Sequence, residues 1–370
     1  MKIALVGEYS GVHTNLKIGL EQIGHEATTI SGGDGFKRFR PDRLNRIPLG
    51  QLARAHQLFV GQPRLLSDLA SNYDVIQFIS PTALVLPRFV PRASYAQWLL
   101  SFLDSFRGVL SMAVAGCDSY VQPVMAASRF CPCAGCLKDS RRSICAYDFD
   151  TAPERGVTDA LTGRVHCFIP FASAAYADAY ASRSGGSNGP FNFPVELSNP
   201  ALPNRRSGPL RVLHGIIRPG FKGTDVILPV LRALVDRHPG RYELVIAERL
   251  PYAEYARLLS TVNVVVDQLY GGGLGMNALG AMARGRVLLT SFDRSFVRGS
   301  VDYRDTPAYD ISHGEEAILS ALEAIQGLSA DELARAGSAS REYVEARCAP
   351  AEVARQLCAV WSRFQKTSIK

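Results

Sequence analysis

Short apolar segments alternate with helical patterns in two separate stretches of the chain, and this alternation constrains the fold more than any other feature. In the first stretch, residues 2–6 have the composition of a buried strand and residues 7–11 that of a tight loop. Leu16, Leu20 and Ile23 then follow at helical spacing, which predicts a helix. The pattern continues with strands expected over 27–30, 74–79 and 109–115 and a helix over 95–106.

The second stretch begins at Leu210, after a polar and proline-rich segment over 199–209. It predicts strands over 210–214, 242–247, 262–267 and 286–291, with helices over 225–237, 252–259 and 276–284. Two further helical patterns cover 330–348 and 350–364.

Alternating strands and helices of this kind predict parallel sheets covered by helices on both faces. We therefore expect an α/β protein with two Rossmann-like, doubly wound domains that face a central cleft. The expected boundaries are 1–198 for the N-terminal domain, 199–209 for a linker and 210–349 for the C-terminal domain. The helix within 350–370 is expected to cross back to the N-terminal domain. Ligands of such folds bind at the carboxyl edges of the sheets.

Composition indicates a globular enzyme, with 47% hydrophobic and 20% charged residues in 370. Only four apolar residues follow Met1 and Lys2, which is too short for a signal peptide, and no stretch approaches a spanning helix. Eight cysteines in a chain of this size do not suggest a disulfide framework. A cytoplasmic location is the resulting expectation.

Positive charge gathers in residues 36–64, within a chain of net charge +7. Seven lysines and arginines lie there against the single acid Asp42. Such a segment suits an anionic membrane surface or a phosphorylated acceptor, and an ordinary solvated surface is the alternative. Peripheral contact with the inner face of a membrane is therefore one expectation. No nucleic-acid-binding module accompanies the charge, so no nucleic acid is expected as a partner.

The loop after the first strand of the second stretch carries two cations. Arg218 and Lys222 stand four residues apart, and Gly220 and Gly223 let the backbone approach a ligand. A guanidinium fork and an ammonium point charge, next to the start of a helix, suit a diphosphate. A surface loop with clustered basic residues is the alternative.

A second glycine-rich loop follows the strand that ends at Asp267. Four glycines lie within 271–275, and a helix of small and apolar residues begins near Met276. The free N–H groups over Gly275–Ala278 would receive a phosphate, although a tight turn without a ligand explains the same residues. Both loops are expected at the same edge of one parallel sheet, which favours a shared phosphate site. Residues 273–278 also match a dinucleotide-binding pattern, but that pattern normally marks the first turn of its domain.

The order of these motifs resembles the retaining GT-B glycosyltransferases called group 1 or family 4. The first domain of that group commonly carries G-H-x-V-T, which is similar to Gly24-His25-Glu26-Ala27-Thr28 here. The block over 273–285 is similar to the group's G-F-G-L-x-x-L-E-A-M-A-x-G. The resemblance implies that Arg218 and Lys222 hold a diphosphate, and that the turn at Leu250 lies near the base of the nucleotide.

The chain departs from this group at two positions. The group carries two glutamates, near the transferred sugar and on the ribose, where this chain has Gly272 and Gly280. Neither glycine offers a side-chain acceptor for a hydroxyl group. Asp267, Asn277 or Glu248 would have to supply substitute acceptors.

The N-terminal stretch contributes further candidates. Gly11, His13 and Asn15 lie at the first loop and helix start, and the resemblance implies an acceptor or phosphate loop there. Asp118 follows the strand expected over 109–115, so its carboxylate would reach the cleft as a catalytic group. A role for Asp118 or His13 in helix capping is the alternative.

Four cysteines form a cluster that the resemblance does not explain. Cys131, Cys133, Cys136 and Cys145 follow a C-x-C-x2-C-x8-C pattern, which supplies enough thiolates for a tetrahedral structural zinc. Iron–sulfur ligation and four reduced thiols are the alternatives. The resemblance implies no cofactor for catalysis.

The expected function is transfer of a sugar from a nucleoside-diphosphate sugar to a glycan, a lipid-linked sugar or a protein. Arg218, Lys222 and Asp118 are the candidate catalytic residues. The candidate donor-binding residues are Gly223, Glu248, Leu250, Asp267, Gly275, Met276, Asn277 and Ala278. The alternatives are a GT-B protein that only binds nucleotide sugars and a non-hydrolysing sugar-nucleotide epimerase.

Overall fold

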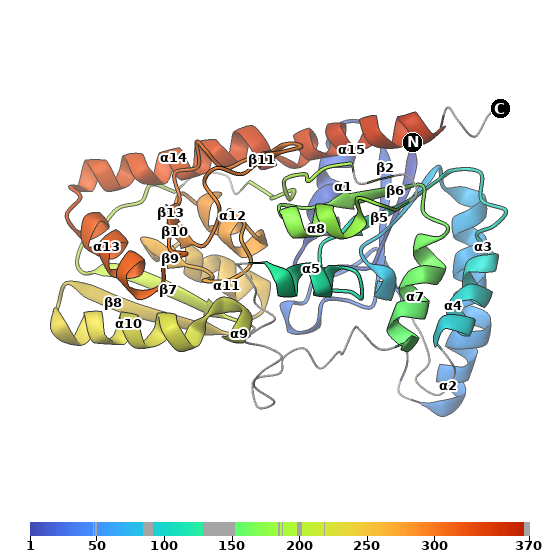
Figure 1. Cartoon of the computed structure of the whole chain (residues 1–370), viewed down its shortest axis with the longest axis horizontal. Coiled ribbons are helices and arrows are strands. Elements are labelled where there is room, and N and C mark those ends of the chain that lie inside the picture. Colours follow the sequence, from blue (N-terminus) through green and yellow to red (C-terminus); the bar gives the residue numbers. More distant parts are fainter. Residues whose placement is uncertain are drawn as a thin grey trace. The chain divides into compact units, whose positions relative to one another are not determined.

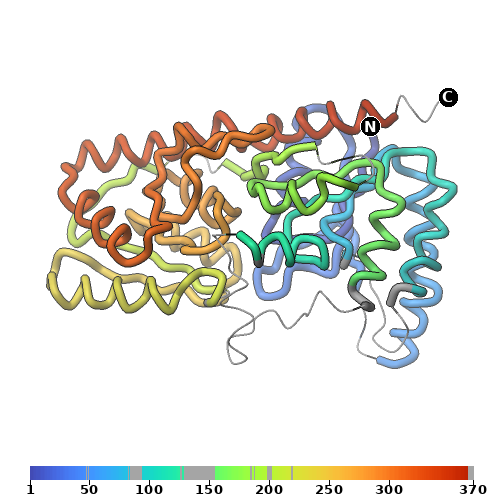
Figure 2. The backbone as a smooth tube through the Cα atoms, in the orientation of Figure 1, coloured from blue at the N-terminus to red at the C-terminus, as the bar shows by residue number. Residues whose placement is uncertain are grey.

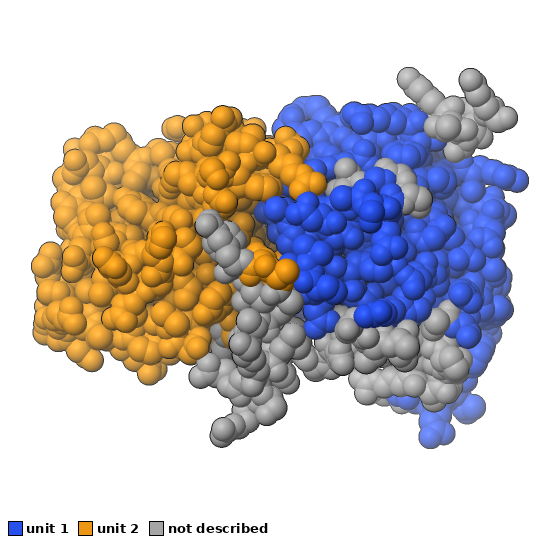
Figure 3. Space-filling model, in the orientation of Figure 1, with its two compact units in different colours: residues 1–124, 147–194, 350–370 blue, residues 125–146, 195–349 orange. Residues whose placement is uncertain are grey.

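The computed structural model describes residues 1–46, 48, 50–83, 92–128, 152–183, 186, 188–197, 202–217 and 219–365. The chain divides into two compact units, which are coloured separately in Figure 3. Unit 1 comprises Met1–Val124, Tyr147–Pro194 and Pro350–Lys370, and unit 2 comprises Met125–Ala146 and Val195–Ala349.

Unit 1 is built on a six-stranded parallel sheet with the order β3-β2-β1-β4-β5-β6. This is the Rossmann order, in which the chain reverses direction across the sheet between β1 and β4. The side chains of β4, β5 and β6 are buried along their whole length, as expected for a strand covered on both faces. The strands are β1 (Lys2–Val6), β2 (Glu26–Ser31), β3 (Arg43–Leu44), β4 (Val75–Phe78), β5 (Val109–Val114) and β6 (Cys167–Pro170).

Helices surround this sheet (Figure 1). They are α1 (Val12–Gln22), α2 (Gln51–His56), α3 (Gln62–Asn72), α4 (Arg92–Ser101), α5 (Val121–Ala127), α7 (Ala152–Thr162), α8 (Ala174–Tyr180) and α15 (Pro350–Gln365). Short helical turns lie at η1 (Gly35–Lys37), η2 (Gln57–Gly61) and η3 (Pro81–Ala83). Helix α4 packs against α3 and α7, which run beside it in Figure 2.

The last helix of the chain, α15, belongs to unit 1 and packs on α1. The two helices approach so closely at Gly19 that a Cβ there would come within 2.0 Å of the Pro350 carbonyl oxygen. Glycine is therefore required at this crossing.

Unit 2 is built on a five-stranded parallel sheet with the order β13-β10-β9-β7-β8. Numbered from its own first strand, this is the flavodoxin-like order 2-1-3-4-5, and the chain reverses direction between β7 and β9. The strands are β7 (Leu210–Ile216), β8 (Tyr242–Glu248), β9 (Val264–Val266), β10 (Val287–Thr290) and β13 (Tyr309–Asp310). A separate antiparallel hairpin joins β11 (Val297–Arg298) to β12 (Val301–Asp302).

Helix α10 contacts α13 and helix α12 contacts α14, and Figure 1 shows helices on both faces of the sheet. The core combines apolar residues of α10, α13 and the central strands, such as Ile227, Leu322 and Val266. The helices are α9 (Pro219–Lys222), α10 (Thr224–Arg237), α11 (Tyr252–Leu259), α12 (Met276–Met282), α13 (Glu315–Gln326) and α14 (Ala330–Cys348).

The segment predicted as a linker is tied to unit 2 where the structure describes it, from residue 202 onward. The side chain of Asn204 is 1% exposed and exchanges two hydrogen bonds of 2.9 Å with Asn263, one to its side chain and one to its carbonyl group. The carbonyl group of Leu202 accepts a hydrogen bond of 2.7 Å from the Arg286 guanidinium. These buried contacts fix the segment to the end of the sheet.

The predicted fold class of two Rossmann-like, parallel-sheet domains is confirmed. None of the helices within the described ranges combines the length and apolar character needed to cross a bilayer.

Candidate functional site

The candidate site of unit 2 lies where the carboxyl ends of β7 and β9 meet. Both strands are parallel and adjacent, so the segments that leave them emerge at the same edge of the sheet. The chain reverses direction between these two strands, and this is the position where open α/β sheets bind ligands. Lys222 lies in α9 after β7, and Asp267 directly follows β9.

The Lys222 ammonium, the Asp267 carboxylate and the Asn277 amide form one polar cluster, which we call the switch-point cluster. Lys222 Nζ and Asn277 Nδ2 both donate to Asp267 Oδ1. The side chain of Lys222 is only 9% exposed and that of Asp267 1% exposed, so the ion pair is buried. The structure therefore brings together Lys222, which the sequence analysis predicted as catalytic, and Asp267 and Asn277, which it predicted as donor-binding.

The second carboxylate oxygen of Asp267 is buried and has no hydrogen-bond partner among the described residues. A buried acceptor without a hydrogen-bond donor lowers the stability of the fold. A ligand or a water molecule that donates a hydrogen bond to this oxygen would remove that cost. Tyr255, on α11, is half-buried, but its hydroxyl oxygen is buried near the cluster. Burial of this group, together with the Asp267 charge, raises the pKa of the hydroxyl. Its ring covers Gly215, where a Cβ would come within 2.8 Å of the hydroxyl oxygen.

His214 connects the two strands beneath the cluster. Its Nδ1 lies 2.8 Å from the Val266 carbonyl oxygen and its Nε2 lies 2.9 Å from the Thr224 hydroxyl. These partners assign a proton to Nδ1, which donates to the carbonyl group, so that Nε2 accepts from the hydroxyl. Burial lowers the pKa of His214, and the nearby Lys222 charge adds to this effect. The imidazole is therefore a neutral structural bridge.

Gly223 allows the loop that carries Lys222 to turn close to the second loop. Its φ angle is 70°, and a Cβ there would come within 2.6 Å of the Leu269 Cβ. The backbone N–H of Leu269 donates to the Lys222 carbonyl group at 2.9 Å, which joins the two loops directly. The candidate residues Gly275, Met276 and Asn277 are half-buried at the start of α12.

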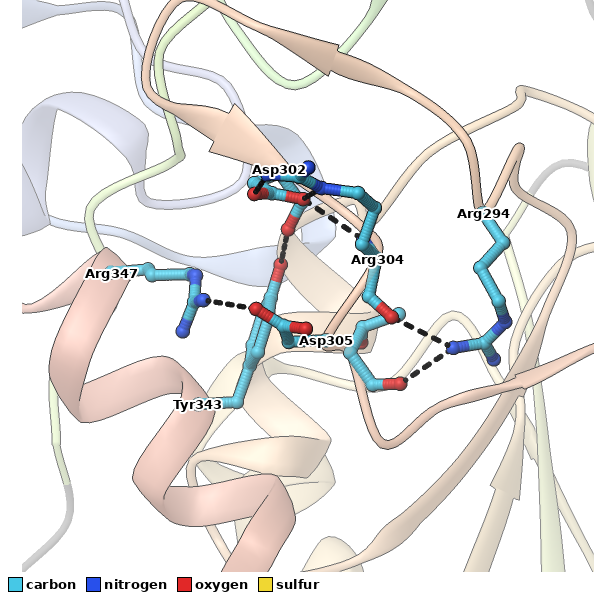
Figure 4. A network of polar contacts seen from close by, with 7 residues as sticks. Arg294, Asp302, Arg304, Asp305, Tyr343 and Arg347 are labelled. Atoms are coloured by element: carbon cyan, nitrogen blue, oxygen red, sulfur yellow. Dashed lines mark hydrogen bonds and ion pairs between the residues drawn. The ribbon is translucent and has the colours of Figure 1, made fainter.

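The glycine-rich loop is anchored by Tyr303, whose side chain is 1% exposed. Its hydroxyl oxygen accepts a hydrogen bond of 3.1 Å from the backbone N–H of Leu274. Figure 4 shows the polar contacts of Asp302 and Arg304, which precede and follow Tyr303 in the chain, and of Asp305. The Tyr343 hydroxyl donates to the Asp302 carbonyl group at 2.9 Å, and Arg347 pairs with Asp305 at 3.5 Å.

Two arginines also stabilise the segment that contains Tyr303. Arg294 donates to the carbonyl groups of Arg304 and Thr306. A hydrogen bond from the Arg304 side chain lowers the pKa of Asp302 to about 2, so this carboxylate stays charged at ordinary pH. The sequence contained no pattern that pointed to this support of the loop.

The remaining candidates of unit 2 lie near the same edge. Glu248 is exposed at the end of β8, and Leu250 is half-buried in the turn that follows. A Cβ at Gly280 would have its nearest neighbour at 3.9 Å, so space for a side chain exists there although the chain supplies none. Arg218 lies outside the described residues.

In unit 1, the loop between β1 and α1 reaches the corresponding reversal point beside β4. Gly11 precedes α1 with a φ angle of 85°, and Asn15 Nδ2 donates to the Pro194 carbonyl group at 3.1 Å. His13 is fully buried: its Nδ1 donates to the Gly7 carbonyl group at 2.8 Å, and its Nε2 accepts from Gln77 at 3.2 Å. Both nitrogens of this imidazole are thus engaged within unit 1.

His13 should make folding sensitive to acid. Burial lowers its pKa from the ordinary 6.5 to about 4, against the opposing effect of its bond to Gly7. Between these pH values the unfolded chain binds a proton that the folded chain does not. Stability is therefore complete above pH 6.5 and is lost as the pH falls toward 4, by about 3 kcal/mol in total.

Urea unfolding at several pH values tests this prediction. We measure how far the free energy of unfolding decreases between pH 7 and pH 4. This decrease should be about 3 kcal/mol smaller for His13→Gln than for the unchanged protein. His56→Gln, at an exposed histidine of α2, is the matched control. Parallel pH profiles for His13→Gln and the unchanged protein would contradict the assignment.

Asp118 makes the contacts of a helix cap. Its Oδ1 accepts from the backbone N–H groups of Tyr120 and Val121 at 2.8 Å, and its Oδ2 accepts from the Tyr180 hydroxyl at 2.6 Å. Burial raises the pKa of this carboxyl group, while the three hydrogen bonds lower it. Its Oδ1 thus caps the start of α5, as in the capping alternative, while its Oδ2 binds Tyr180 of α8. The catalytic role of Asp118 stays a prediction.

Sequence reasoning missed a polar group in the first loop of unit 1. Glu8 is buried, and its Oε2 accepts from the backbone N–H and the hydroxyl of Thr14 at 2.8 and 2.7 Å. Burial raises the pKa of Glu8. Asp34 accepts from the Ser10 backbone at 2.6 Å and from Lys37 at 3.0 Å. The position of Glu8, two residues after the end of the first strand, was the signal available in the sequence.

The zinc prediction falls outside the described residues, because Cys131, Cys133, Cys136 and Cys145 all do. Within the described ranges, no group of three or more His, Cys, Asp or Glu side chains is arranged to hold a metal ion. The cysteine cluster stays a prediction that elemental analysis of the purified protein would test.

Comparisons with known proteins bear on the fold. No protein-family model matches the chain, and no curated protein sequence matches it. The structure is similar to sucrose-phosphate synthase from Thermosynechococcus elongatus, with a TM-score of 0.58 and 14% identity over 99% of this chain and 100% of that one. It is also similar to Anabaena HepE in complex with UDP-glucose, with a TM-score of 0.55 and 12% identity over 98% and 100% of the two chains.

A third similar structure is WaaG, a glycosyltransferase involved in lipopolysaccharide biosynthesis, with a TM-score of 0.53 and 11% identity over 95% of this chain and 98% of that one. Identities this low establish a common architecture, and the coverage shows that it extends over both units. The chain therefore has the GT-B fold of such glycosyltransferases, with one Rossmann-like parallel sheet in each of its two units.

Proposed function

We propose that the chain is a glycosyltransferase that moves a sugar from a nucleoside-diphosphate sugar to an acceptor. The observation that carries this proposal is the switch-point cluster of unit 2. A buried ammonium group lies there at the ligand-binding edge of a parallel sheet, next to a glycine-rich loop and the start of a helix. HepE, which has the same fold, is described in complex with UDP-glucose.

In this proposal Lys222 and Arg218 hold the diphosphate, and the backbone of Gly275–Ala278 contacts its oxygens. Loss of the sugar leaves negative charge on the diphosphate, and fixed positive charge at that position stabilises the transition state. Without a ligand Lys222 is paired with Asp267, so a bound diphosphate would share the ammonium group with this carboxylate.

In this proposal Asp267 and Asn277 accept hydrogen bonds from hydroxyl groups of the donor. Gly272 and Gly280 have no side chain that could do so. The unpartnered Oδ2 of Asp267 supports this role, because a hydroxyl group of the donor would supply the missing hydrogen bond. Glu248, at the end of the neighbouring strand β8, and Leu250, in the turn that follows it, would lie near the nucleoside. Gly11 and Asn15 of unit 1 belong to the proposed acceptor side.

The acceptor is proposed to be a glycan, a lipid-linked sugar or a protein. The basic segment 36–64 further supports a location at the inner face of an anionic membrane, within the cytoplasm.

A panel of uridine, adenosine and guanosine diphosphate sugars tests the proposal. We expect one nucleotide class to bind and its sugar to be transferred to water or to an added acceptor, with release of the nucleoside diphosphate. Analysis of the remaining donor by NMR would reveal epimerisation. An epimerised donor, or binding without turnover across a panel that includes acceptors, would contradict transferase activity.

A further inference from the structure

Large apolar side chains stand exposed around α2 in unit 1. Leu52 is 89% exposed, Phe59 is 54% exposed and Trp98 is 43% exposed. None of the six residues of α2 is buried. Contiguous apolar exposure of this kind marks a surface that binds a partner rather than an ordinary solvated helix.

These side chains are neighbours. Helix α2, the π-helical turn η2 and α3 follow one another without a break in helical backbone, so Leu52 and Phe59 lie about two turns apart on one helix. The ring of Phe59 packs against Tyr95, with centroids 6.3 Å apart. Tyr95 in turn packs against Trp98, with centroids 5.6 Å apart.

The segment after β3 adds a fourth apolar side chain and a charge. Asn45 accepts a hydrogen bond of 3.1 Å from the Gln57 amide, which places its neighbours beside η2. Those neighbours are Leu44, which is 58% exposed, and the exposed Arg46. We call the resulting group the α2 surface; it consists of Leu44, Arg46, Leu52, Arg54, Phe59 and Trp98.

The α2 surface is cationic as well as apolar. Arg46 and Arg54 have no carboxylate partner among the described residues. The nearest acids in the sequence are already paired, Asp42 with Lys17 and Asp68 with Arg43. Neither α2, η2 nor α4 contains an acidic residue.

We propose that the α2 surface binds the surface of an anionic lipid bilayer. Leucine, phenylalanine and tryptophan side chains enter the boundary between headgroups and acyl chains, while arginines beside them contact acidic headgroups. A symmetric contact with a second copy would bring the arginines of both copies together. Binding of a polyanion such as nucleic acid would use the arginines but would not explain why Leu52 of α2 is exposed. This inference rests on the membrane location proposed above and assigns it a surface, but it does not depend on glycosyl transfer, so the vesicle test and the donor test can fail separately.

Cosedimentation of the full chain with lipid vesicles tests the proposal. We expect binding to phosphatidylcholine vesicles that contain phosphatidylglycerol, little binding to phosphatidylcholine alone, and weaker binding at high salt. Arg46→Gln with Arg54→Gln should lower the partition coefficient about 25-fold, because each arginine contributes about fivefold near an anionic surface. Leu52→Ser with Phe59→Ser should lower it at least about tenfold.

Val297→Ser with Arg232→Gln is the matched control, because it changes an exposed apolar residue and an exposed arginine of unit 2. It should leave binding unchanged. Circular dichroism should show the same melting temperature for all variants, since every changed side chain is exposed.

Tryptophan fluorescence gives a second, independent readout. The chain has two tryptophans, and Trp361 is fully buried, so lipids reach Trp98 alone. Brominated lipids should quench part of the emission, and Trp98→Phe should remove the quenching. Three results would overturn the proposal. They are failure of the unchanged protein to bind anionic vesicles, vesicle binding unaffected by both double variants, and self-association or heparin binding that depends on this surface without vesicle binding.

Discussion

Asp267→Asn is expected to lower the free energy of unfolding of unit 2 by about 3–5 kcal/mol. The substitution keeps the shape of the side chain but leaves the Lys222 ammonium group buried without a negative partner, and breaking one side of a buried ion pair has a cost of this size. The two side chains are only 9% and 1% exposed, so water cannot replace the lost partner. Differential scanning calorimetry should show a melting temperature roughly 6–20 °C lower.

The double variant Asp267→Asn with Lys222→Met isolates the ion pair. Because it removes both charges together, it should recover most of the stability that Asp267→Asn loses, as observed when buried pairs are replaced as a whole. Arg355→Gln is the matched control, since it removes an exposed ion pair with Glu352 and should change stability by less than about 1 kcal/mol. Equal destabilisation in the single and double variants would show that the two charges are not coupled.

The sheets could be predicted because parallel strands buried on both faces appear in the sequence as short apolar runs. The strands expected over 2–6 and 27–30 are observed as Lys2–Val6 and Glu26–Ser31, and the helix expected over 330–348 has the same bounds in the structure. The strand β6 was not predicted. It is only four residues long and it ends in Pro170, a residue that counts against a strand in sequence reading.

The pairing of Lys222 with Asp267 could not be predicted. The two residues are 45 positions apart, and the order of strands that makes β7 and β9 neighbours follows from tertiary packing. The sequence correctly indicated that both loops leave one sheet edge. It did not reveal that the Lys222 ammonium group there is already paired with the Asp267 carboxylate.

Long-range contacts also distinguish between the alternative roles of two other candidate residues, His13 and Asp118. In the sequence His13 and Asp118 are polar residues next to loops, a pattern shared by ligand contacts and helix caps. In the structure, Gln77 and Tyr180 approach them from elements 64 and 62 residues away. Contacts at such separation leave no periodic pattern, so local sequence reasoning could not distinguish the alternatives.

Removal of both proposed phosphate-binding cations is expected to weaken nucleotide binding by at least about a hundredfold. A variant with Arg218→Gln, Lys222→Met and Asp267→Asn should bind the nucleoside diphosphate about a hundred- to ten-thousandfold more weakly than the unchanged protein. Each cation is expected to contribute about 1.5–3 kcal/mol through a charged hydrogen bond, and about 1.4 kcal/mol corresponds to a factor of ten. Isothermal titration calorimetry measures this change directly.

The Asp267→Asn change belongs in this variant because it prevents a buried carboxylate from destabilising the fold and from repelling the phosphates. The variant with Asp267→Asn and Lys222→Met alone should lose about ten- to a hundredfold, since it keeps Arg218. Arg232→Gln, at an exposed arginine of α10, should bind as the unchanged protein does.

The salt dependence of binding separates the effect of charge from that of shape. The affinity should fall with ionic strength in the unchanged protein and vary little in the triple variant. Equal affinities and equal salt dependence in the two proteins would mean that the diphosphate is not held by these cations, and the switch-point cluster would then be a structural ion pair.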